Sequence, residues 1–260
     1  MRNYLFTILK GVLMLALFVS VVFSMQQWQR PDLKWEVHSK DRPQPEVINP
    51  GTQSTQDRAG TPPSDAVVLF NGEDLSAWEN GKGEKAGWKI ENGELVIPGG
   101  TGSIFTKQPF GDVQFHIEWQ APVPPEGEGQ GRGNSGIKFM RMYEVQILDS
   151  YDNTTYPDGQ AASVYGQYPP LVNVSRPPGK WQIYDIIFRR PHFDSAGNVT
   201  KPSYITVFHN GVLVQDHVEL IGKTGGARSP YQAHPDELPI MLQDHKNPVR
   251  FRNIWVRELE

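Results

Sequence analysis

The sequence predicts an all-β domain of two stacked antiparallel sheets, a sandwich or jelly roll. Its 260 residues include 22 Pro and 25 Gly, which favour many turns and short strands. Apolar and polar residues alternate with a period of two in many short segments. No stretch sustains the 3.6-residue period of an amphipathic helix. Ten or more strands in a chain of this length are typical of two sheets packed face to face.

The first segment, residues 1–24, is predicted to be a signal peptide or an N-terminal anchor. Arg2 and Lys10 both precede the apolar run GVLMLALFVSVVFSM. The run is shorter than the about 20 residues of a membrane span, and Val22 and Ser24 suit a cleavage site. We therefore expect an exported protein, periplasmic or extracellular, with membrane contact only through a retained N-terminus.

Residues 25–64 are predicted to be a flexible linker, because they are polar, rich in Pro, Gln, Asp and Ser, and without a period. The folded domain is expected to span residues 65–260. Its strands are predicted, in order, within AVVLF, GWKIENGELVIP, DVQFHIEWQAP, SGIKFMRM, YEVQILD, WQIYDIIFRR, SYITVFHNGVLVQDHVEL, PIMLQDH and VRFRNIWVREL.

Two of these segments contain Asn-Gly, at Asn92-Gly93 and Asn210-Gly211, which predicts tight hairpins. In DVQFHIEWQAP, the apolar residues Val113 to Trp119 alternate with polar ones, so one face is expected to pack and the other to be polar. The strand tryptophans are expected in the core: Trp88, Trp119, Trp181 and Trp255.

Two long loops interrupt the strands. Residues 122–136 are glycine-rich and predicted to be flexible. Residues 150–180 contain several tyrosines, including Tyr151 and Tyr165, which suit an ordered loop that walls a pocket.

Composition excludes several classes of function. The net charge of −4, without a large basic block, argues against nucleic acid as a partner. The absence of cysteine rules out disulfides, thiolate nucleophiles and Cys–zinc sites. The Asp, Glu and His residues lack metal-ligand spacing, so we expect no cofactor; a bound calcium or other divalent metal is the alternative.

Polar faces recur on three predicted strands: His116 with Glu118, Glu144 with Gln146, and Gln243 with His245. If these faces share one concave sheet, their carboxylates, amides and imidazoles would bind sugar hydroxyls and move protons. The alternative is that each is only the solvated face of an antiparallel strand.

Several motifs together resemble the 3-keto-disaccharide hydrolase domain family: LFNGEDLSAWE, GNSGIKF, YEVQILDSY, DGQAASVYGQYPPLVNVSRPPGKWQIYDIIF, VFHNGVLVQDH and LPIMLQDHKNPVRFRNIWVREL. The resemblance extends over residues 65–260. It implies a concanavalin A-like jelly roll whose concave sheet binds sugar. It also implies a carbohydrate partner, a glycoside already oxidised to a ketone at C3, and export from a bacterial cell.

A ketone at C3 acidifies the proton at C2, so cleavage can proceed by proton abstraction, elimination and hydration. We expect Glu144 or His116 to be the base, and His245 to be the acid or a donor to the ketone oxygen. The residues expected to bind or orient the substrate are Glu118, Gln146, Asp149, Arg141, Gln243, Tyr151 and Tyr165.

Two other functions are compatible with the same residues. One is a conventional glycoside hydrolase that uses Glu118 and Glu144 as its carboxylate pair. The other is a non-catalytic carbohydrate-binding module.

Overall fold

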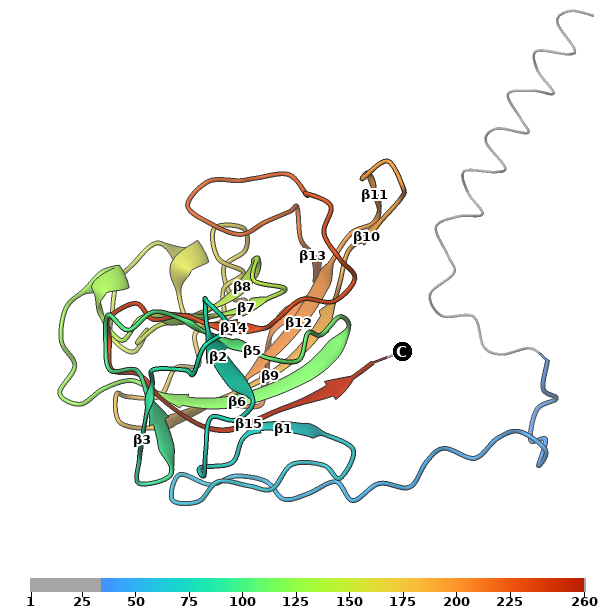
Figure 1. Cartoon of the computed structure of the whole chain (residues 1–260), viewed down its shortest axis with the longest axis horizontal. Helices are drawn as coiled ribbons and strands as arrows, with labels where there is room; N and C mark the ends of the chain where they lie inside the picture. The colour runs from blue at the N-terminus through green and yellow to red at the C-terminus, as the bar shows by residue number, and fades with distance from the viewer. Residues whose placement is uncertain (1–33, 260) are drawn as a thin grey trace, which may run out of the picture. The chain divides into compact units, whose positions relative to one another are not determined.

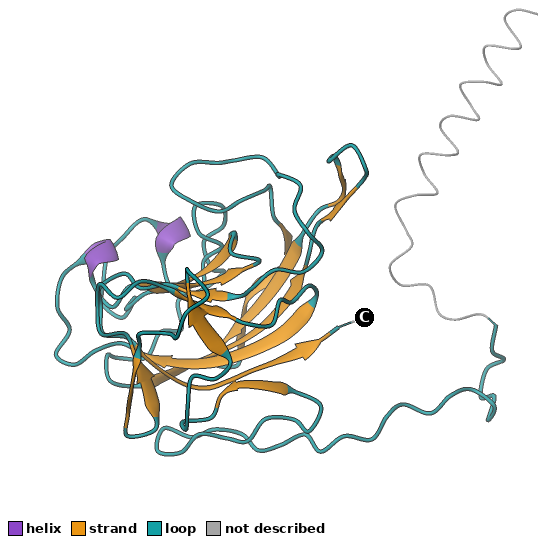
Figure 2. Cartoon of the chain, viewed as in Figure 1, coloured by secondary structure: helices purple, strands orange, loops and turns teal. Residues whose placement is uncertain are grey.

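The computed structural model describes residues 34–259 and confirms an all-β, concanavalin A-like jelly roll (Figures 1 and 2). The compact unit begins at Ile48, and residues 34–47 belong to a separate unit. The predicted leader, residues 1–24, lies outside the described residues. Within residues 34–259, no helix has the length and apolar character needed to cross a membrane.

The larger sheet has eight antiparallel strands. β1 (Val67–Phe70) pairs with β15 beside the main path of the sheet. The order along that path is β13 (Val212–Glu219), β12 (Tyr204–His209), β9 (Trp181–Arg189), β6 (Val113–Gln120), β15 (Arg250–Glu258), β4 (Glu94–Val96) and β3 (Lys89–Glu91).

The smaller sheet has five strands and lies against the larger one in Figure 1. Its order is β2 (Trp78–Asn80), β5 (Ile104–Thr106), β14 (Met241–Leu242), β7 (Ser135–Phe139) and β8 (Tyr143–Ile147). The remaining elements are a short hairpin and two single-turn helices: β10 (His192–Phe193), β11 (Val199–Lys201), η1 (Gly129–Gly131) and η2 (Pro157–Gly159).

Aromatic side chains fill the space between the two sheets. The ring of Phe139 on β7 packs edge-on against Phe115 of β6 and stacks on Phe188 of β9, with centroids 5.6 and 4.8 Å apart. The Tyr184 hydroxyl of β9 donates a hydrogen bond to the Gln146 carbonyl oxygen at 3.0 Å. Because these inner faces meet, side chains on the outer faces of the two sheets point in opposite directions.

Both Asn-Gly hairpins are confirmed. Glu91 pairs with Glu94 across one turn, and His209 pairs with Val212 across the other. Asn92, at φ 54°, and Asn210, also at φ 54°, each precede a glycine of positive φ. These dihedrals match the two-residue turn that suits the twist of a hairpin.

A β-bulge in β15 changes which side chains face the core. Its pairing with β6 shifts register between Arg252 and Trp255, and Asn253 adopts φ 48°. The bulge reverses the alternation, so Trp255 stacks on His116 at the outer face, with centroids 4.8 Å apart. Trp181 also lies there, beneath the Arg252 guanidinium. Both tryptophans are buried, as predicted, but they lie on this outer face and not in the cluster between the sheets, where Trp88 and Trp119 lie.

Residues 48–64, predicted as the end of the linker, lie along the larger sheet and are here called the strap. A bridge between Thr52 and Thr61 closes the strap into a loop. The Gln56 side chain bonds both the backbone N–H and the carbonyl of Trp181, at 2.8 and 3.0 Å. The folded unit therefore begins before the predicted start at residue 65.

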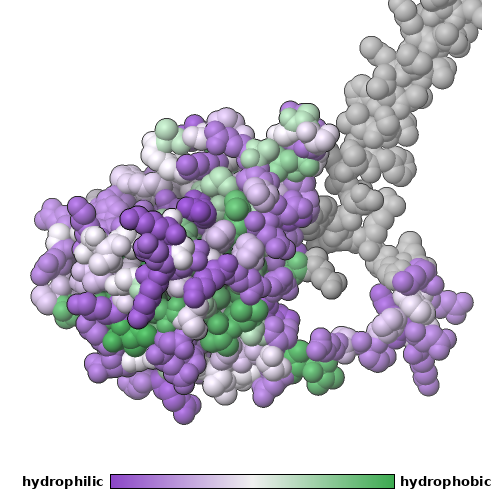
Figure 3. Space-filling model, in the orientation of Figure 1, coloured by the Kyte–Doolittle hydropathy of each residue, from purple (hydrophilic) through white to green (hydrophobic). Residues whose placement is uncertain are grey.

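The face seen in Figure 3 is largely hydrophilic, with a hydrophobic band across its lower part.

Candidate functional site

The polar residues that the sequence suggests for one sheet form two clusters on opposite sides of the sandwich. His116 and Glu118 alternate with core residues of β6, so they occupy the outer face of the larger sheet. Glu144 and Gln146 alternate with core residues of β8, so they occupy the outer face of the smaller sheet. The expectation of a single shared cluster is wrong, because a core that buries both inner faces separates the two outer faces.

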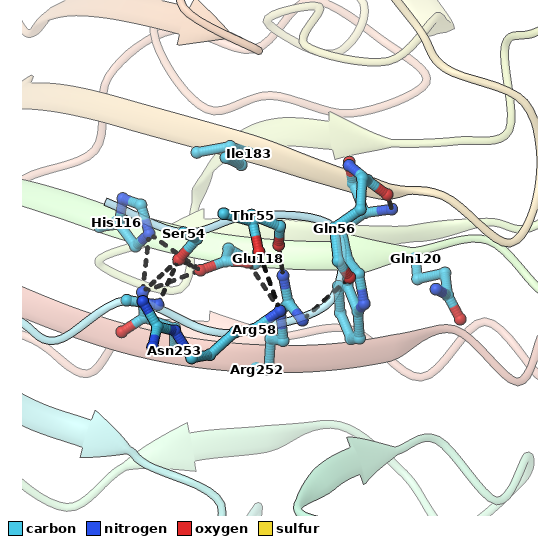
Figure 4. Close-up of polar contacts among 12 residues, drawn as sticks. Ser54, Thr55, Gln56, Arg58, His116, Glu118, Gln120, Ile183, Arg252 and Asn253 are labelled. Carbon is cyan, nitrogen blue, oxygen red and sulfur yellow. Dashed lines mark hydrogen bonds and ion pairs between the residues drawn. The ribbon is translucent and has the colours of Figure 1, made fainter. Parts of the chain in front are cut away.

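The first group, the strap cluster, consists of His116, Glu118, Asp185, Arg252, Asn253 and Ser54, all of them labelled in Figure 4 except Asp185. Arg252 Nε lies 2.7 Å from Glu118 Oε2, and Asn253 Nδ2 donates to Glu118 Oε1 at 2.8 Å. The Ser54 hydroxyl of the strap also donates to this carboxylate. The Glu118 side chain is fully buried, so the strap and the sheet together satisfy a carboxylate that has no access to solvent.

Neighbouring charges set the protonation states in the strap cluster. Burial by itself would raise the pKa of Glu118, but hydrogen bonds from His116, Ser54, Asn253 and Arg252 hold it below the ordinary value. Burial would lower the pKa of His116, but its bonds to Asp185 and Glu118 raise it. His116 Nδ1 is 2.6 Å from Asp185 Oδ1. The side chains of the strap cluster therefore hydrogen-bond and ion-pair with one another.

The second group, the sheet site, consists of Lys138, Glu144, Gln146, Gln130 and Asn134 around the outer face of the smaller sheet. Strand register aligns Glu144 with Lys138, Lys138 with Met241, and Met241 with Phe105. A row of charged and apolar side chains therefore crosses four neighbouring strands. Charged groups beside a flat apolar strip suit a sugar ring, which has both hydroxyls and C–H faces.

Glu144 and Lys138 form the central pair of this row. Lys138 Nζ is 3.2 Å from Glu144 Oε2, and their side chains are 21% and 4% exposed. Burial raises the pKa of Glu144 above the ordinary value, and the nearby charge of Lys138 opposes part of that rise. A buried carboxylate of raised pKa beside a half-buried ammonium is suited to proton transfer near neutral pH.

An amide network extends the sheet site along β8. Gln146 Nε2 donates to Gln130 Oε1 at 3.1 Å and lies 3.4 Å from Asn134 Oδ1. Asn134 Nδ2 in turn donates to the Gln130 carbonyl oxygen at 2.7 Å. On the other side, the Glu144 backbone N–H donates to the Thr224 hydroxyl at 3.0 Å. These bonds hold β8 and its polar side chains in place.

The loop after β8 is ordered against the edge of that strand, as the sequence predicts, and its role as the wall of a pocket remains a prediction. The Tyr165 N–H donates to the Glu144 carbonyl oxygen at 3.2 Å, and the Tyr165 hydroxyl is 2.8 Å from that of Tyr156. The same loop hydrogen-bonds the edge of β8 through Ala162 and Ser163. In Figure 1 it appears in yellow beside β8. Tyr151 is 40% exposed on this loop.

The other predicted residues have varied surroundings. Asp149 is buried in an ion pair with Arg132, whose Nε is 2.9 Å from Asp149 Oδ2, so it orders the loop. The Gln243 N–H donates to the Gly136 carbonyl oxygen at 2.9 Å. His245 follows in an exposed loop. The Arg141 guanidinium lies 4.5 Å from the centroid of the Phe105 ring, at the end of the central row.

Arg141 occupies an uncommon backbone conformation. Met140 and Arg141 have φ 51° and 64° in the turn that joins β7 and β8. Non-glycine residues at positive φ are costly and cluster at functional sites. Here the positive φ values belong to the tight turn between the paired residues Phe139 and Tyr143, and the expected role of Arg141 at the substrate remains a prediction.

Sequence reasoning did not select Lys138, Asn134 or Gln130. The signal for Lys138 is the alternation within SGIKF, which puts Gly136 and Lys138 on the face opposite Ile137 and Phe139. Asn134 and Gln130 lie in a glycine-rich loop without periodicity. Only the fold brings them to Gln146.

Gly136 leaves the space that Glu144 occupies. A Cβ atom at this position would overlap Glu144 Oε1, the end of a flexible side chain. Gly136→Ala is therefore expected to change the free energy of unfolding by less than about 1 kcal/mol while displacing the carboxylate. Urea denaturation checks the first expectation, and a loss of kcat checks the second. Unchanged kcat would show that the position of this carboxylate is unimportant for turnover.

The residues that the structure describes contain no group of three His, Cys, Asp or Glu side chains able to hold a metal ion. The absence of a cofactor remains a prediction.

Comparison with known proteins establishes the family. Residues 65–257 match the model of the 3-keto-alpha-glucoside-1,2-lyase-like domain. The chain belongs to this family. The family resemblance seen in the sequence is confirmed, and family membership indicates a carbohydrate-active protein.

Two solved structures from Parabacteroides distasonis ATCC 8503, both described as candidate glycosyl hydrolases, are similar to this family member. One is 45% identical, covers 88% of this chain and 97% of its own, and has a TM-score of 0.80. The other is 20% identical, covers 75% and 94%, and has a TM-score of 0.52, so it supports the fold alone. Among curated proteins, none matches the chain.

Proposed function

We propose that the protein is an exported enzyme that cleaves the glycosidic bond of 3-keto-glycosides or 3-keto-disaccharides at the sheet site. The observation that carries this proposal is the buried Glu144 carboxylate, whose Oε2 lies 3.2 Å from Lys138 Nζ. Family membership supports the substrate class, since the family is described by a 3-keto-α-glucoside and a 1,2-lyase activity.

The reaction begins with removal of the acidic C2 proton by the Glu144 carboxylate. The electrons of the C2–H bond form an enolate with the C3 ketone. The enolate then returns to the ketone, a double bond forms between C1 and C2, and the bond between C1 and the glycosidic oxygen breaks. Addition of water across the double bond completes net hydrolysis, whereas release of the unsaturated sugar makes the enzyme a lyase.

Lys138 supplies the positive charge that this route needs. Its ammonium stabilises the negative charge that develops on the ketone oxygen, and Gln146 binds neighbouring hydroxyls. The leaving oxygen requires a proton, for which His245 and the newly protonated Glu144 are the candidates. His116 has no part in this scheme, because it lies on the opposite side of the sandwich.

The proposal is tested by incubating the protein with a glycoside and with its 3-keto derivative. We expect release of the leaving group only from the oxidised sugar. A product with ultraviolet absorbance of a conjugated enone would indicate elimination. Turnover of the unoxidised glycoside would instead support direct hydrolysis without a C3 ketone. The predicted carboxylate pair of Glu118 and Glu144 could not carry that reaction, because the two side chains lie on opposite sides of the sandwich. Binding without turnover would support a carbohydrate-binding module.

Lys138→Met is expected to move the pH dependence of kcat. The Glu144 carboxylate acts as a base only when deprotonated, so activity falls as the pH drops through its pKa. Because Lys138 holds that pKa down, its removal raises the pKa and shifts the acidic limb to higher pH. A pH–rate profile measures the shift. An acidic limb that stays at the same pH would show that Glu144 is not the group whose protonation lowers kcat.

A further inference from the structure

The loop after β8 adds a short stretch of chain to the edge of the smaller sheet. Val164 pairs with Val145 in an antiparallel bridge, and the Tyr165 N–H donates to the Glu144 carbonyl oxygen at 3.2 Å. In an antiparallel pair, the residues next to a bridge also lie opposite each other, so Tyr165 is opposite Glu144. Val164 and Val145 both belong to the core, and alternation therefore places Tyr165 and Glu144 together on the outer face.

Tyr165 thus extends the row of the sheet site by one position. Lys138 pairs with Glu144 from the other side, so the side chains follow one another in the order Tyr165, Glu144 and Lys138. Opposed side chains on one face of an antiparallel pair have Cβ atoms about 4.5–5.5 Å apart. The Tyr165 side chain therefore begins directly beside that of Glu144, on the side away from the Lys138 ammonium.

A second phenol is hydrogen-bonded to the first. The hydroxyl oxygens of Tyr156 and Tyr165 are 2.8 Å apart. Burial, the hydrogen bond with Tyr165 and the nearby Glu144 carboxylate raise the pKa of Tyr156, so this phenol is protonated at neutral pH. Tyr165 is half-buried, whereas Tyr156 is 46% exposed. The pair of hydroxyls therefore connects the row to solvent.

The order of the row matches the order of the reacting atoms. In the proposed reaction the ketone is at C3, the acidic proton is at C2 and the leaving oxygen is at C1. With Lys138 at the ketone oxygen and Glu144 at the C2 proton, the next position along the row, that of Tyr165, adjoins the bond between C1 and the leaving oxygen. A neutral phenol there has a proton to donate, whereas His245 lies in an exposed loop that is not part of the row.

We propose that Tyr165 donates the proton to the leaving oxygen and that Tyr156 relays a replacement proton from solvent. This role rests on the proposed function of the sheet site. As the bond from C1 breaks, its electron pair passes to the leaving oxygen, which takes the proton of the Tyr165 hydroxyl. Tyr156 gives its own proton to the resulting phenolate and regains one from water. Glu144 releases the C2 proton to solvent, so all three groups return to their starting states.

Leaving groups of different basicity test the role of Tyr165. The full chain is assayed with methyl 3-keto-glucoside, whose leaving oxygen needs a proton, and with 4-nitrophenyl 3-keto-glucoside, whose phenolate leaves without one. For Tyr165→Phe we expect kcat to fall by about 10²-fold or more on the methyl glycoside and to stay within about threefold on the nitrophenyl glycoside. A loss of packing would lower both rates together.

Two further variants complete the comparison. Tyr156→Phe is expected to show the same selectivity for the methyl glycoside with a smaller loss, about tenfold, because Tyr165 keeps its own hydroxyl. Tyr168→Phe is the matched control, since it removes a hydroxyl from a half-buried tyrosine of the same loop that packs against the core. We expect it to behave like the wild type on both substrates.

Deuterium exchange at C2 separates proton donation from proton removal. In deuterated water, an enolate that fails to lose its leaving group takes up deuterium at C2. We therefore expect Tyr165→Phe to incorporate more deuterium into unreacted methyl glycoside, for each molecule cleaved, than the wild type does.

Three outcomes would overturn the role of Tyr165 while leaving the proposed function intact: unchanged cleavage of the methyl glycoside, equal losses on the two glycosides, or loss of C2 exchange together with cleavage. A wild-type chain that turns over neither substrate would overturn the proposed function, and the role of Tyr165 with it.

Discussion

Glu144→Gln is expected to lower kcat on a 3-keto-glycoside by about 10²–10⁴-fold, the usual contribution of a general base. Glutamine keeps the size of the side chain and its ability to hydrogen-bond, but it cannot accept the C2 proton. Burial of the Glu144 side chain leaves little room for a water molecule to replace the carboxylate. Steady-state kinetics on a 3-keto-disaccharide measures the loss, and solvent deuterium exchange at C2 reports the proton transfer separately.

His116→Gln is the informative companion, because the sequence names both residues as candidate bases. His116 belongs to the outer face of the larger sheet, across the core from Glu144. We expect its kcat to remain within about twofold of the wild type, with the effect confined to stability. A strong loss of kcat for His116→Gln together with normal turnover for Glu144→Gln would move the active site to the strap cluster.

Arg252→Met is expected to destabilise the protein by about 3–5 kcal/mol, the cost of leaving a buried charge without its partner. The fully buried Glu118 carboxylate loses the guanidinium that lies 2.7 Å from it. The strap also loses an anchor, since Arg252 Nη2 donates to the Thr55 carbonyl oxygen. Urea denaturation followed by tryptophan fluorescence measures the change in the free energy of unfolding.

A double variant separates the lost charge pair from lost packing. Adding Glu118→Gln to Arg252→Met removes the unpaired charge, so we expect part of the stability to return. A double variant no more stable than Arg252→Met would assign the loss to packing on Trp181, over whose ring the guanidinium lies at 4.2 Å.

The stability that the Glu118–Arg252 ion pair contributes is expected to decrease as the pH falls. The pKa of Glu118 is lowered in the folded protein, so its pairing stabilises the fold above the pKa of the unfolded chain. That contribution is lost as the pH falls through the folded pKa. The stability difference between the wild type and Arg252→Met is therefore expected to narrow in acid.

Much of the fold follows from local patterns. The Asn-Gly pairs at 92–93 and 210–211 specify two hairpins, because these residues tolerate the positive φ that the turns require. Alternation in β6 and β8 correctly indicates which side chains pack and which form a polar face. The polar face of YEVQI was accordingly recognisable from the sequence as a candidate site.

Long-range pairing accounts for what the patterns missed. The alternation in the sequence predicts that Trp255 lies between the sheets, but the bulge at Asn253 reverses the alternation in β15 and places it on the outer face. The strap looks like a linker because its polar side chains have no period. They are ordered by the buried Glu118 and Arg252, which come from distant strands.

Alternation along a strand states which residues share a face, but not which sheet the strand joins or toward which side that sheet turns. His116 and Glu144 have equivalent patterns, yet β6 and β8 belong to different sheets whose inner faces pack together. The sequence therefore determines the polar faces, the turns and the family. The pairing of strands alone places Lys138 beside Glu144 and puts His116 on the far side of the sandwich. It also leaves Gly136, which pairs with Gln146, in contact with the Glu144 carboxylate, because these neighbours are set by non-local register.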